Sequence, residues 1–124
     1  MRLQEFTLVF SVSLDEEYVR LHLVSSHLTL DLGARNHNYL LLTLARRLLR
    51  DVKDGMSDVT CGWVLLNDWS HDPSTCSLRL NIHVHRIRRQ FASRRIVDAE
   101  TIIERRVQNR QMRLGTTRVR IDVL

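Results

Sequence analysis

The stretch SLRLNIHVHRIRR, from Ser77 to Arg89, organises the interpretation of the whole chain. Read as a helix, it places an apolar stripe at helical spacing along Leu80, Val84, Ile87 and Phe91. The opposite side then carries polar residues: Arg79, His83, Arg86 and Gln90. We therefore expect one face of this helix to anchor in a core and the other face to be free for a partner.

The composition is that of one globular domain covering residues 1–124. Hydrophobic residues make up 44% of the chain and charged residues 27%, which suffices for one core but not for a second domain. No apolar run reaches the roughly 18 residues that a membrane helix needs, and no signal-peptide pattern begins the chain. The two cysteines, Cys61 and Cys76, are too few for a disulfide framework. We expect a cytoplasmic protein that does not contact a membrane.

Positive charge is concentrated in the half of the chain that contains this stretch. Residues 1–62 carry seven Lys and Arg against eight Asp and Glu, a net charge of −1, whereas residues 63–124 carry twelve against six, a net charge of +6. All the cations except Lys53 are arginines, which suit bidentate contacts to phosphate and guanine. A polyanion is therefore the favoured partner, and a merely solvated arginine-rich face is the alternative.

Residues 3–33 are predicted to form an N-terminal antiparallel β-meander. Apolar and polar residues alternate over 6–13, 18–24 and 27–32, which is the pattern of half-buried strands on short connections. Leu28, Leu30 and Leu32 are expected to share one face, and Gly33 is expected to close the sheet.

Residues 36–93 are predicted to form a three-helix core. The first helix, capped by Asn36 or Asn38, runs to about Val52 and buries an apolar stripe that includes Leu41, Leu44, Leu48 and Val52. A short helix at 65–69 and a turn with Pro73 then precede the basic helix, which Ser74 or Thr75 would cap. A short helix, a turn and a longer basic helix make a helix-turn-helix.

Residues 101–123 are predicted to form a basic hairpin and a last strand. Residues 101–107 and 111–114 alternate around a polar turn at 108–110, Gly115 ends the hairpin, and 117–123 alternates again as a strand at the surface or a sheet edge. The chain is thus expected to be α+β, with a meander, three helices and a C-terminal hairpin.

This order resembles the winged-helix DNA-binding output domain of response regulators, the OmpR/PhoB type. The stretch LNIHVHRIRRQF, residues 80–91, is similar to the family's recognition-helix signature VDVHI.RLRRKL, with His83, Arg86 and Arg88 in matching places. ERRVQNRQMRLG stands where the family has its wing. Asn81 replaces the family's Asp, the wing lacks the Gly-Tyr pair, and the strand after Gly115 is additional. A looser similarity is to winged-helix segments linked to bacterial forkhead-associated signalling proteins.

The resemblance implies a transcription regulator that binds double-stranded DNA, alone or as a homodimer. The helix would enter the major groove and read base edges with Arg79, Ile82, His83 and Arg86. Phosphate contacts would come from Arg88, Arg89, Arg94 and Arg95, toward the end of this helix, and from Arg105, Arg106 and Arg110 on the wing.

A winged-helix module that binds a protein of a bacterial signalling or secretion pathway is the alternative, because fold alone does not determine function. No cofactor or metal is expected, since the His and Cys spacing matches no known zinc finger. Nor is an enzyme expected, because the chain has no nucleophile elbow, glycine-rich phosphate loop or HExxH motif.

Overall fold

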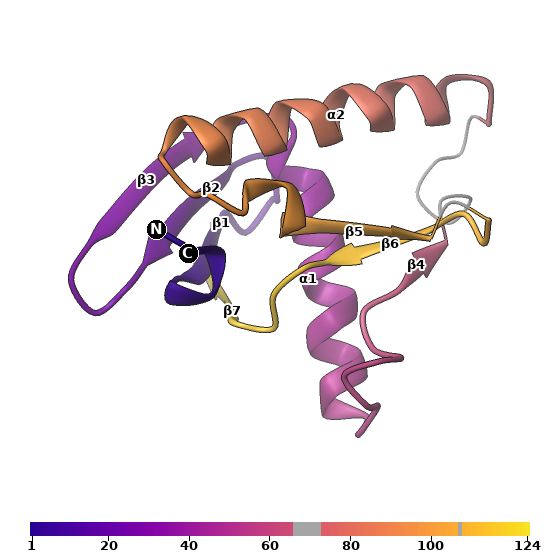
Figure 1. Ribbon diagram of the computed structural model, residues 1–124, viewed down its shortest axis with the longest axis horizontal. Helices are drawn as coiled ribbons and strands as arrows, with labels where there is room; N and C mark the ends of the chain where they lie inside the picture. The colour runs from indigo at the N-terminus through magenta and orange to yellow at the C-terminus, as the bar shows by residue number, and fades with distance from the viewer. Residues whose placement is uncertain (66–72, 107) are drawn as a thin grey trace.

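The computed structural model describes residues 1–65, 73–106 and 108–124, and within 73–79 it describes the backbone alone. The fold is α+β, as predicted (Figure 1). Its elements are β1 (Thr7–Val12), β2 (Val19–Val24), β3 (Thr29–Ala34), α1 (Asn38–Lys53), β4 (Val64–Leu65), α2 (Pro73–Ser93), β5 (Ile103–Arg106), β6 (Gln111–Leu114) and β7 (Val119–Val123). Short 3₁₀ helices lie at Leu3–Glu5 and Ala99–Ile102.

The first sheet confirms the predicted meander and adds a strand from the other end of the chain. Its order is β3-β2-β1-β7, with β1–β2 and β2–β3 antiparallel and β1–β7 parallel. The last strand, expected at the surface or a sheet edge, is β7 at the edge of this N-terminal sheet, and it does not pair with the hairpin. Gly33 does not close the sheet either: it lies within β3 at φ 76°, next to a register shift opposite Leu21 and His22.

The second sheet is the predicted hairpin with one unpredicted strand. Strands β5 and β6 pair antiparallel, and β4 pairs with β6 to give the order β4-β6-β5. The helix expected at 65–69 is wrong at its first residue, since Leu65 belongs to β4 and is exposed. Residues 66–69 lie outside the described part of the chain, so two α-helices are described rather than the expected three.

Helix α1 is the predicted first helix, with two corrections. His37 is its N-cap residue, while the expected cap Asn38 is fully buried and donates hydrogen bonds from Nδ2 to the carbonyls of Val19 and Gly33. Val52 is exposed, and the neighbouring Asp51 is buried because it accepts hydrogen bonds from the Gly62 amide and the Arg47 side chain. The tertiary contacts of the two polar residues override the apolar pattern.

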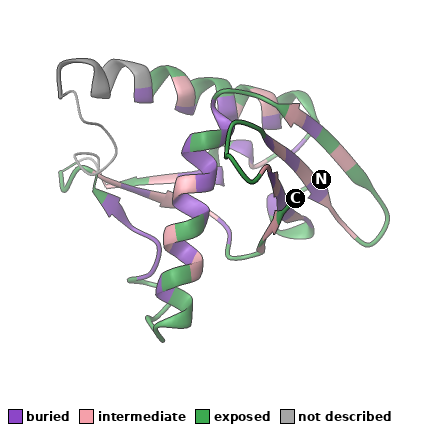
Figure 2. Cartoon of the chain, turned by 180° about the vertical axis from the view of Figure 1, so that it is seen from behind, coloured by how far each residue is buried: buried purple, intermediate pink, exposed green. Residues whose placement is uncertain are grey.

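Helix α2 extends beyond both ends of the predicted stretch. It begins at Pro73, so Ser74 and Thr75 lie within the first turn rather than at the N-cap position where they were expected. The predicted stripe is confirmed in full: Leu80, Val84, Ile87 and Phe91 are each at most 2% exposed. In Figure 2 buried and exposed positions alternate along the described part of this helix, as expected for an amphipathic element.

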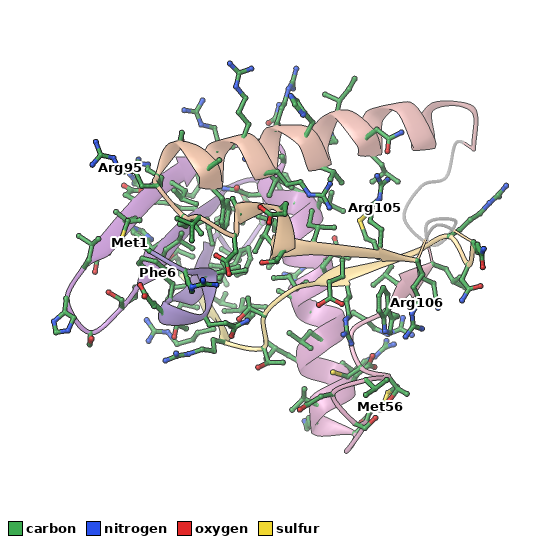
Figure 3. All side chains as sticks on the ribbon, viewed as in Figure 1. Met1, Phe6, Met56, Arg95, Arg105 and Arg106 are labelled. Atoms are coloured by element: carbon green, nitrogen blue, oxygen red, sulfur yellow. The ribbon has the colours of Figure 1, made fainter. Side chains whose placement is uncertain are left out.

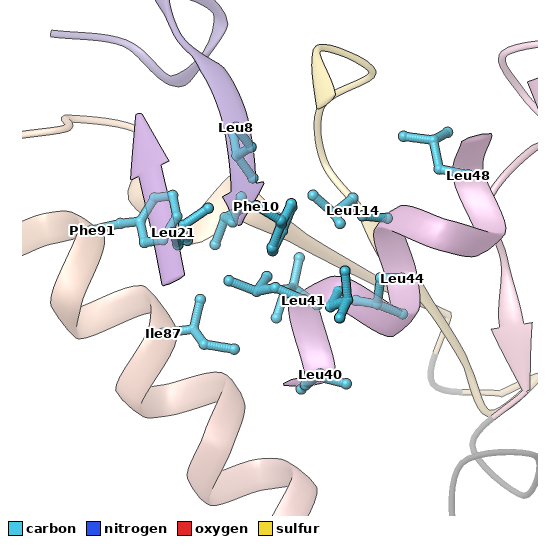
Figure 4. Packing of buried hydrophobic residues seen from close by; sticks show 14 of the residues in the cluster. Leu8, Phe10, Leu21, Leu40, Leu41, Leu44, Leu48, Ile87, Phe91 and Leu114 are labelled. Atoms are coloured by element: carbon cyan, nitrogen blue, oxygen red, sulfur yellow. The ribbon is translucent and has the colours of Figure 1, made fainter. Parts of the chain in front are cut away.

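One hydrophobic core joins both sheets and both helices. Figure 4 shows side chains of β1, β2, β6, α1 and α2 gathered in it, including Phe10, Leu21, Leu41, Ile87 and Leu114. Leu28, expected to share one face with Leu30 and Leu32, precedes β3 and is exposed, whereas Leu32 is buried. The last strand, β7, lies beside the first strand, β1, so that segments from the two ends of the chain share the first sheet (Figure 1). Among the described residues, no helix combines the length and apolarity required to span a membrane.

Candidate nucleic-acid interface

The buried stripe of α2 determines which of its side chains face outward. With Leu80, Val84, Ile87 and Phe91 in the core, the exposed residues of the middle and second half include Ile82, His85, Arg86 and Arg89, which we call the outer face of α2. Ile82 is 42% exposed although it is apolar. The outer face therefore carries cations and one exposed apolar side chain, and it includes the predicted contact residues Ile82 and Arg86.

No carboxylate interrupts this basic segment. The sequence from Pro73 to Val97 contains six arginines and no Asp or Glu. The guanidinium groups of Arg86 and Arg89 make no ion pair or hydrogen bond with any described residue. Their charge is thus not neutralised within the described structure.

The structure divides the predicted base-reading residues between two environments. His83 is half-buried on the side of α2 that faces the start of α1, where it interacts electrostatically with His37. Gln90, on the same side, accepts a hydrogen bond at Oε1 from His37 Nε2 at 2.7 Å and donates from Nε2 to the Leu32 carbonyl at 2.8 Å. The side chain of Arg79 lies outside the described residues. Ile82 and Arg86 are therefore the described base-reading candidates that lie exposed.

His37 is buried beside several cations. Burial lowers its pKa from the ordinary value near 6.5, and His83, Arg35 and Arg86 lower it further, whereas the hydrogen bond to Gln90 acts in the opposite direction. The neutral imidazole is consequently favoured at neutral pH, with the ring proton on Nε2 directed to Gln90.

Arg88 and Arg105 connect α2 to the hairpin. Arg88 Nη2 donates to the Ile103 carbonyl at 2.9 Å, and Arg105 Nη2 donates to Asn81 Oδ1 at 2.7 Å. In Figure 3 the Arg105 side chain rises from β5 toward α2. Desolvation, and then the nearby Arg88 charge, lower the pKa of Arg105. Both residues were expected to contact phosphate, and both instead have partners within the molecule.

Arg106 lies on the other side of the hairpin, against Trp63 (Figure 3). Its guanidinium carbon is 3.9 Å from the Trp63 ring centroid, and that of Arg113 is 4.6 Å from it. This cation–π stacking holds the guanidinium group of Arg106 against Trp63, within the fold. Of the three predicted wing arginines, Arg110 alone is exposed and without a partner among the described residues, at the hairpin turn with φ 52°.

Arg94 and Arg95 follow the last residue of α2, Ser93. Arg94 Nη2 donates to the Asp31 carbonyl of β3 at 2.8 Å. Arg95 adopts φ 63° just after α2, and its carbonyl accepts a hydrogen bond from the N-terminal amine of Met1. Both side chains are exposed, but Arg94 is directed to the sheet rather than along the outer face.

A pocket of about 600 Å³ lies beside the outer face. It is lined by residues before α1 and by the second half of α2: Arg35, Asn36, His37, Arg86, Arg89, Gln90 and Ser93. Sequence reasoning missed Arg35 because it is separated from Arg86 by fifty residues and belongs to no helical or strand pattern.

Comparison with protein-family models, curated proteins and solved structures finds no match to this chain.

Proposed function

We propose that the protein binds double-stranded DNA through the outer face of α2, in a winged-helix arrangement with the β5–β6 hairpin as the wing. The observation that carries this proposal is the outer face itself. Arg86 and Arg89 are exposed and have no partner among the described residues, Ile82 lies on the same face, and the sequence of α2 contains no carboxylate. Arginine donors and an apolar side chain on one helix face match guanine edges, thymine methyl groups and phosphates.

The hairpin supports the same proposal. It follows α2 in the chain, is held to it by the Arg105–Asn81 and Arg88–Ile103 hydrogen bonds, and places the turn with Arg110 toward the α2 end that begins at Pro73 (Figure 1). Arg86 and Ile82 are then the proposed base contacts, Arg89 and Arg110 the proposed phosphate contacts, and Arg79 and His83 stay predictions. The protein would act as a transcription regulator.

Mobility-shift titrations with two arginine variants test the proposal. Duplexes selected from a random library are titrated at low and at moderate salt with the wild type, Arg86→Ala and Arg110→Ala. Arg86→Ala should lose about 1 to 3 kcal/mol of discrimination between selected and scrambled duplexes. Arg110→Ala should weaken binding to all duplexes alike and reduce the slope of log K against log salt by about 1.

Lys53→Gln is the control, because Lys53 lies exposed at the opposite end of α1 from this surface. It removes one positive charge and should leave DNA affinity close to that of the wild type. If neither arginine variant changes binding to duplex DNA, or if the wild type binds duplex DNA with only a shallow salt dependence, the DNA proposal fails.

A protein-interaction module is the second candidate, and the exposure of Ile82 favours it. An apolar side chain within a basic face suits an acidic protein as well as DNA. Such a module would show the shallow salt dependence on duplex DNA just described together with saturable binding to a protein partner.

A further inference from the structure

The pocket beside α2 gathers three arginines from two segments of the chain. Arg35 precedes α1, whereas Arg86 and Arg89 lie one helical turn apart on α2, and all three line the same cavity of about 600 Å³. Cavities of this size are in the range that accommodates small molecules. The N-cap residue of α1, His37, also lines it, so the positive end of the α1 dipole lies at this pocket.

These three guanidinium groups differ from most others in the molecule. Arg20, Arg46, Arg113 and Arg120 pair with carboxylates, and Arg88, Arg94 and Arg118 donate to backbone carbonyls. Arg35, Arg86 and Arg89, by contrast, have neither an ion pair nor a hydrogen bond to any described residue, and the pocket lining includes no carboxylate. Three unpaired cations around one cavity repel one another, and a multiply charged anion would relieve that repulsion.

We propose that this pocket binds the phosphate group of a small phosphorylated molecule, with Arg35, Arg86 and Arg89 donating hydrogen bonds to its oxygens. A phosphate group offers three acceptor oxygens and up to two negative charges, which matches three guanidinium donors better than a single carboxylate does. The inference does not depend on the proposed function. If both hold, the ligand and DNA share Arg86 and Arg89, and the ligand would compete with DNA.

His37 provides a reporter inside the pocket. The charged groups that face it are Arg35 on its own segment and His83 and Arg86 on α2, with the amide of Gln90 hydrogen-bonded to Nε2. The cations among them lower the pKa of His37. An anion bound between the arginines would offset this repulsion and raise the pKa of His37.

The test is a titration of the full chain with inorganic pyrophosphate, followed by calorimetry and by NMR of the His37 ring. Saturable binding is expected, with an upward shift in the pKa of His37. Arg35→Gln should weaken binding about tenfold or more, because it removes a charge-assisted hydrogen bond. Lys53→Gln removes the same charge roughly 24 Å away along the 16 residues of α1, beyond the Debye length at physiological salt, and should change binding less than about twofold.

The remaining outcomes overturn the inference or separate it from the proposed function. Absence of saturable pyrophosphate binding at millimolar concentration, or equal weakening by Arg35→Gln and Lys53→Gln, overturns it. If Arg35→Gln weakens duplex DNA binding while pyrophosphate does not bind the wild type, the pocket accepts a backbone phosphate, so the small-ligand inference fails and the proposed function stands. If pyrophosphate binds through Arg35 and duplex DNA does not bind, the small-ligand inference stands and the proposed function fails.

Discussion

Gly115 occupies a position where another chain segment leaves no room for a side chain. A Cβ atom on Gly115 would lie 1.5 Å from the carbonyl oxygen of Thr101, and the Gly115 amide donates to the Ile102 carbonyl at 2.8 Å. Its φ is not in the left-handed region, so glycine is required here for space rather than for backbone conformation. The close approach fixes the end of β6 against the segment that leads into β5.

We therefore expect Gly115→Ala to destabilise the protein by about 3 kcal/mol, at the upper end of the usual cost of overpacking, because backbone rather than a side chain must move. Gly33→Ala is the matched control: Gly33 has φ 76° and nothing within 4 Å of the position that an added Cβ would occupy, so it should cost only about 1 kcal/mol of conformational strain. Urea unfolding of both variants measures the difference, and equal midpoints would contradict the steric explanation.

At the scale of elements, Asn38 joins α1 to two strands of the first sheet. Its Nδ2 donates to the carbonyl of Val19 in β2 at 3.0 Å and to that of Gly33 in β3 at 2.9 Å, and the side chain is fully buried. The side chain thus supplies hydrogen-bond donors to the backbone carbonyls of Val19 and Gly33. This explains why an asparagine that resembles a helix cap is not used as one.

Asn38→Ala should cost about 1 to 3 kcal/mol of stability, since the donors are lost and polar groups stay buried. Asn38→Asp should cost more at neutral pH, because a buried carboxylate would face two carbonyl oxygens. Burial raises the pKa of such a carboxyl in the folded state, so the penalty of Asn38→Asp should decrease as the pH falls and the acid becomes a donor. Thermal unfolding at neutral and acidic pH measures this, and a penalty that is independent of pH would contradict it.

Helix α2 combines an anchor and a contact surface in one element. Its stripe is buried in the hydrophobic core, its Arg88 and Asn81 make hydrogen bonds to the hairpin, and its outer face is exposed. The division follows from the helical period, because residues three and four apart share a face. The predicted set of phosphate contacts is narrower in the structure, since Arg88, Arg105 and Arg106 have internal partners that no periodicity in the sequence indicates.

At the scale of the whole molecule, the last strand, β7, pairs with the first strand, β1. The Leu8 amide donates to the Arg118 carbonyl at 2.9 Å, and the Leu124 amide donates to the Val12 carbonyl at 2.8 Å. Since amides on a strand alternate in direction, the amide of Asp122 faces β1 like that of Leu124, and the amide of Val123 faces away. Without β7, β1 would be an unpaired edge of the first sheet.

Asp122→Pro should accordingly destabilise the protein by about 1 to 3 kcal/mol more than Val123→Pro, because only the former removes a hydrogen bond to β1. The Arg120–Asp122 ion pair lost in the same variant is exposed and contributes little. Urea unfolding, with hydrogen exchange of the β1 amides as a second readout, checks the expectation. Equal destabilisation by both prolines would show that β7 pairing does not support the sheet.

The sequence alone determined those features that depend on residues close together in the chain. The strands β1, β2 and β3, the hairpin β5–β6, and the four buried residues of α2 follow from local patterns and are confirmed. The period-two alternation fails at Val9, which is buried, and at Leu28, which is exposed. The tertiary structure alone decided the partners of distant polar groups. In the described residues β4 pairs with β6, β7 pairs with β1, Arg88 and Arg105 have internal hydrogen-bond partners, and Arg35 lines the same pocket as Arg86 and Arg89. Periodicity reports which face of an element is buried, whereas the meeting of polar groups far apart in the chain is set by how those faces pack together.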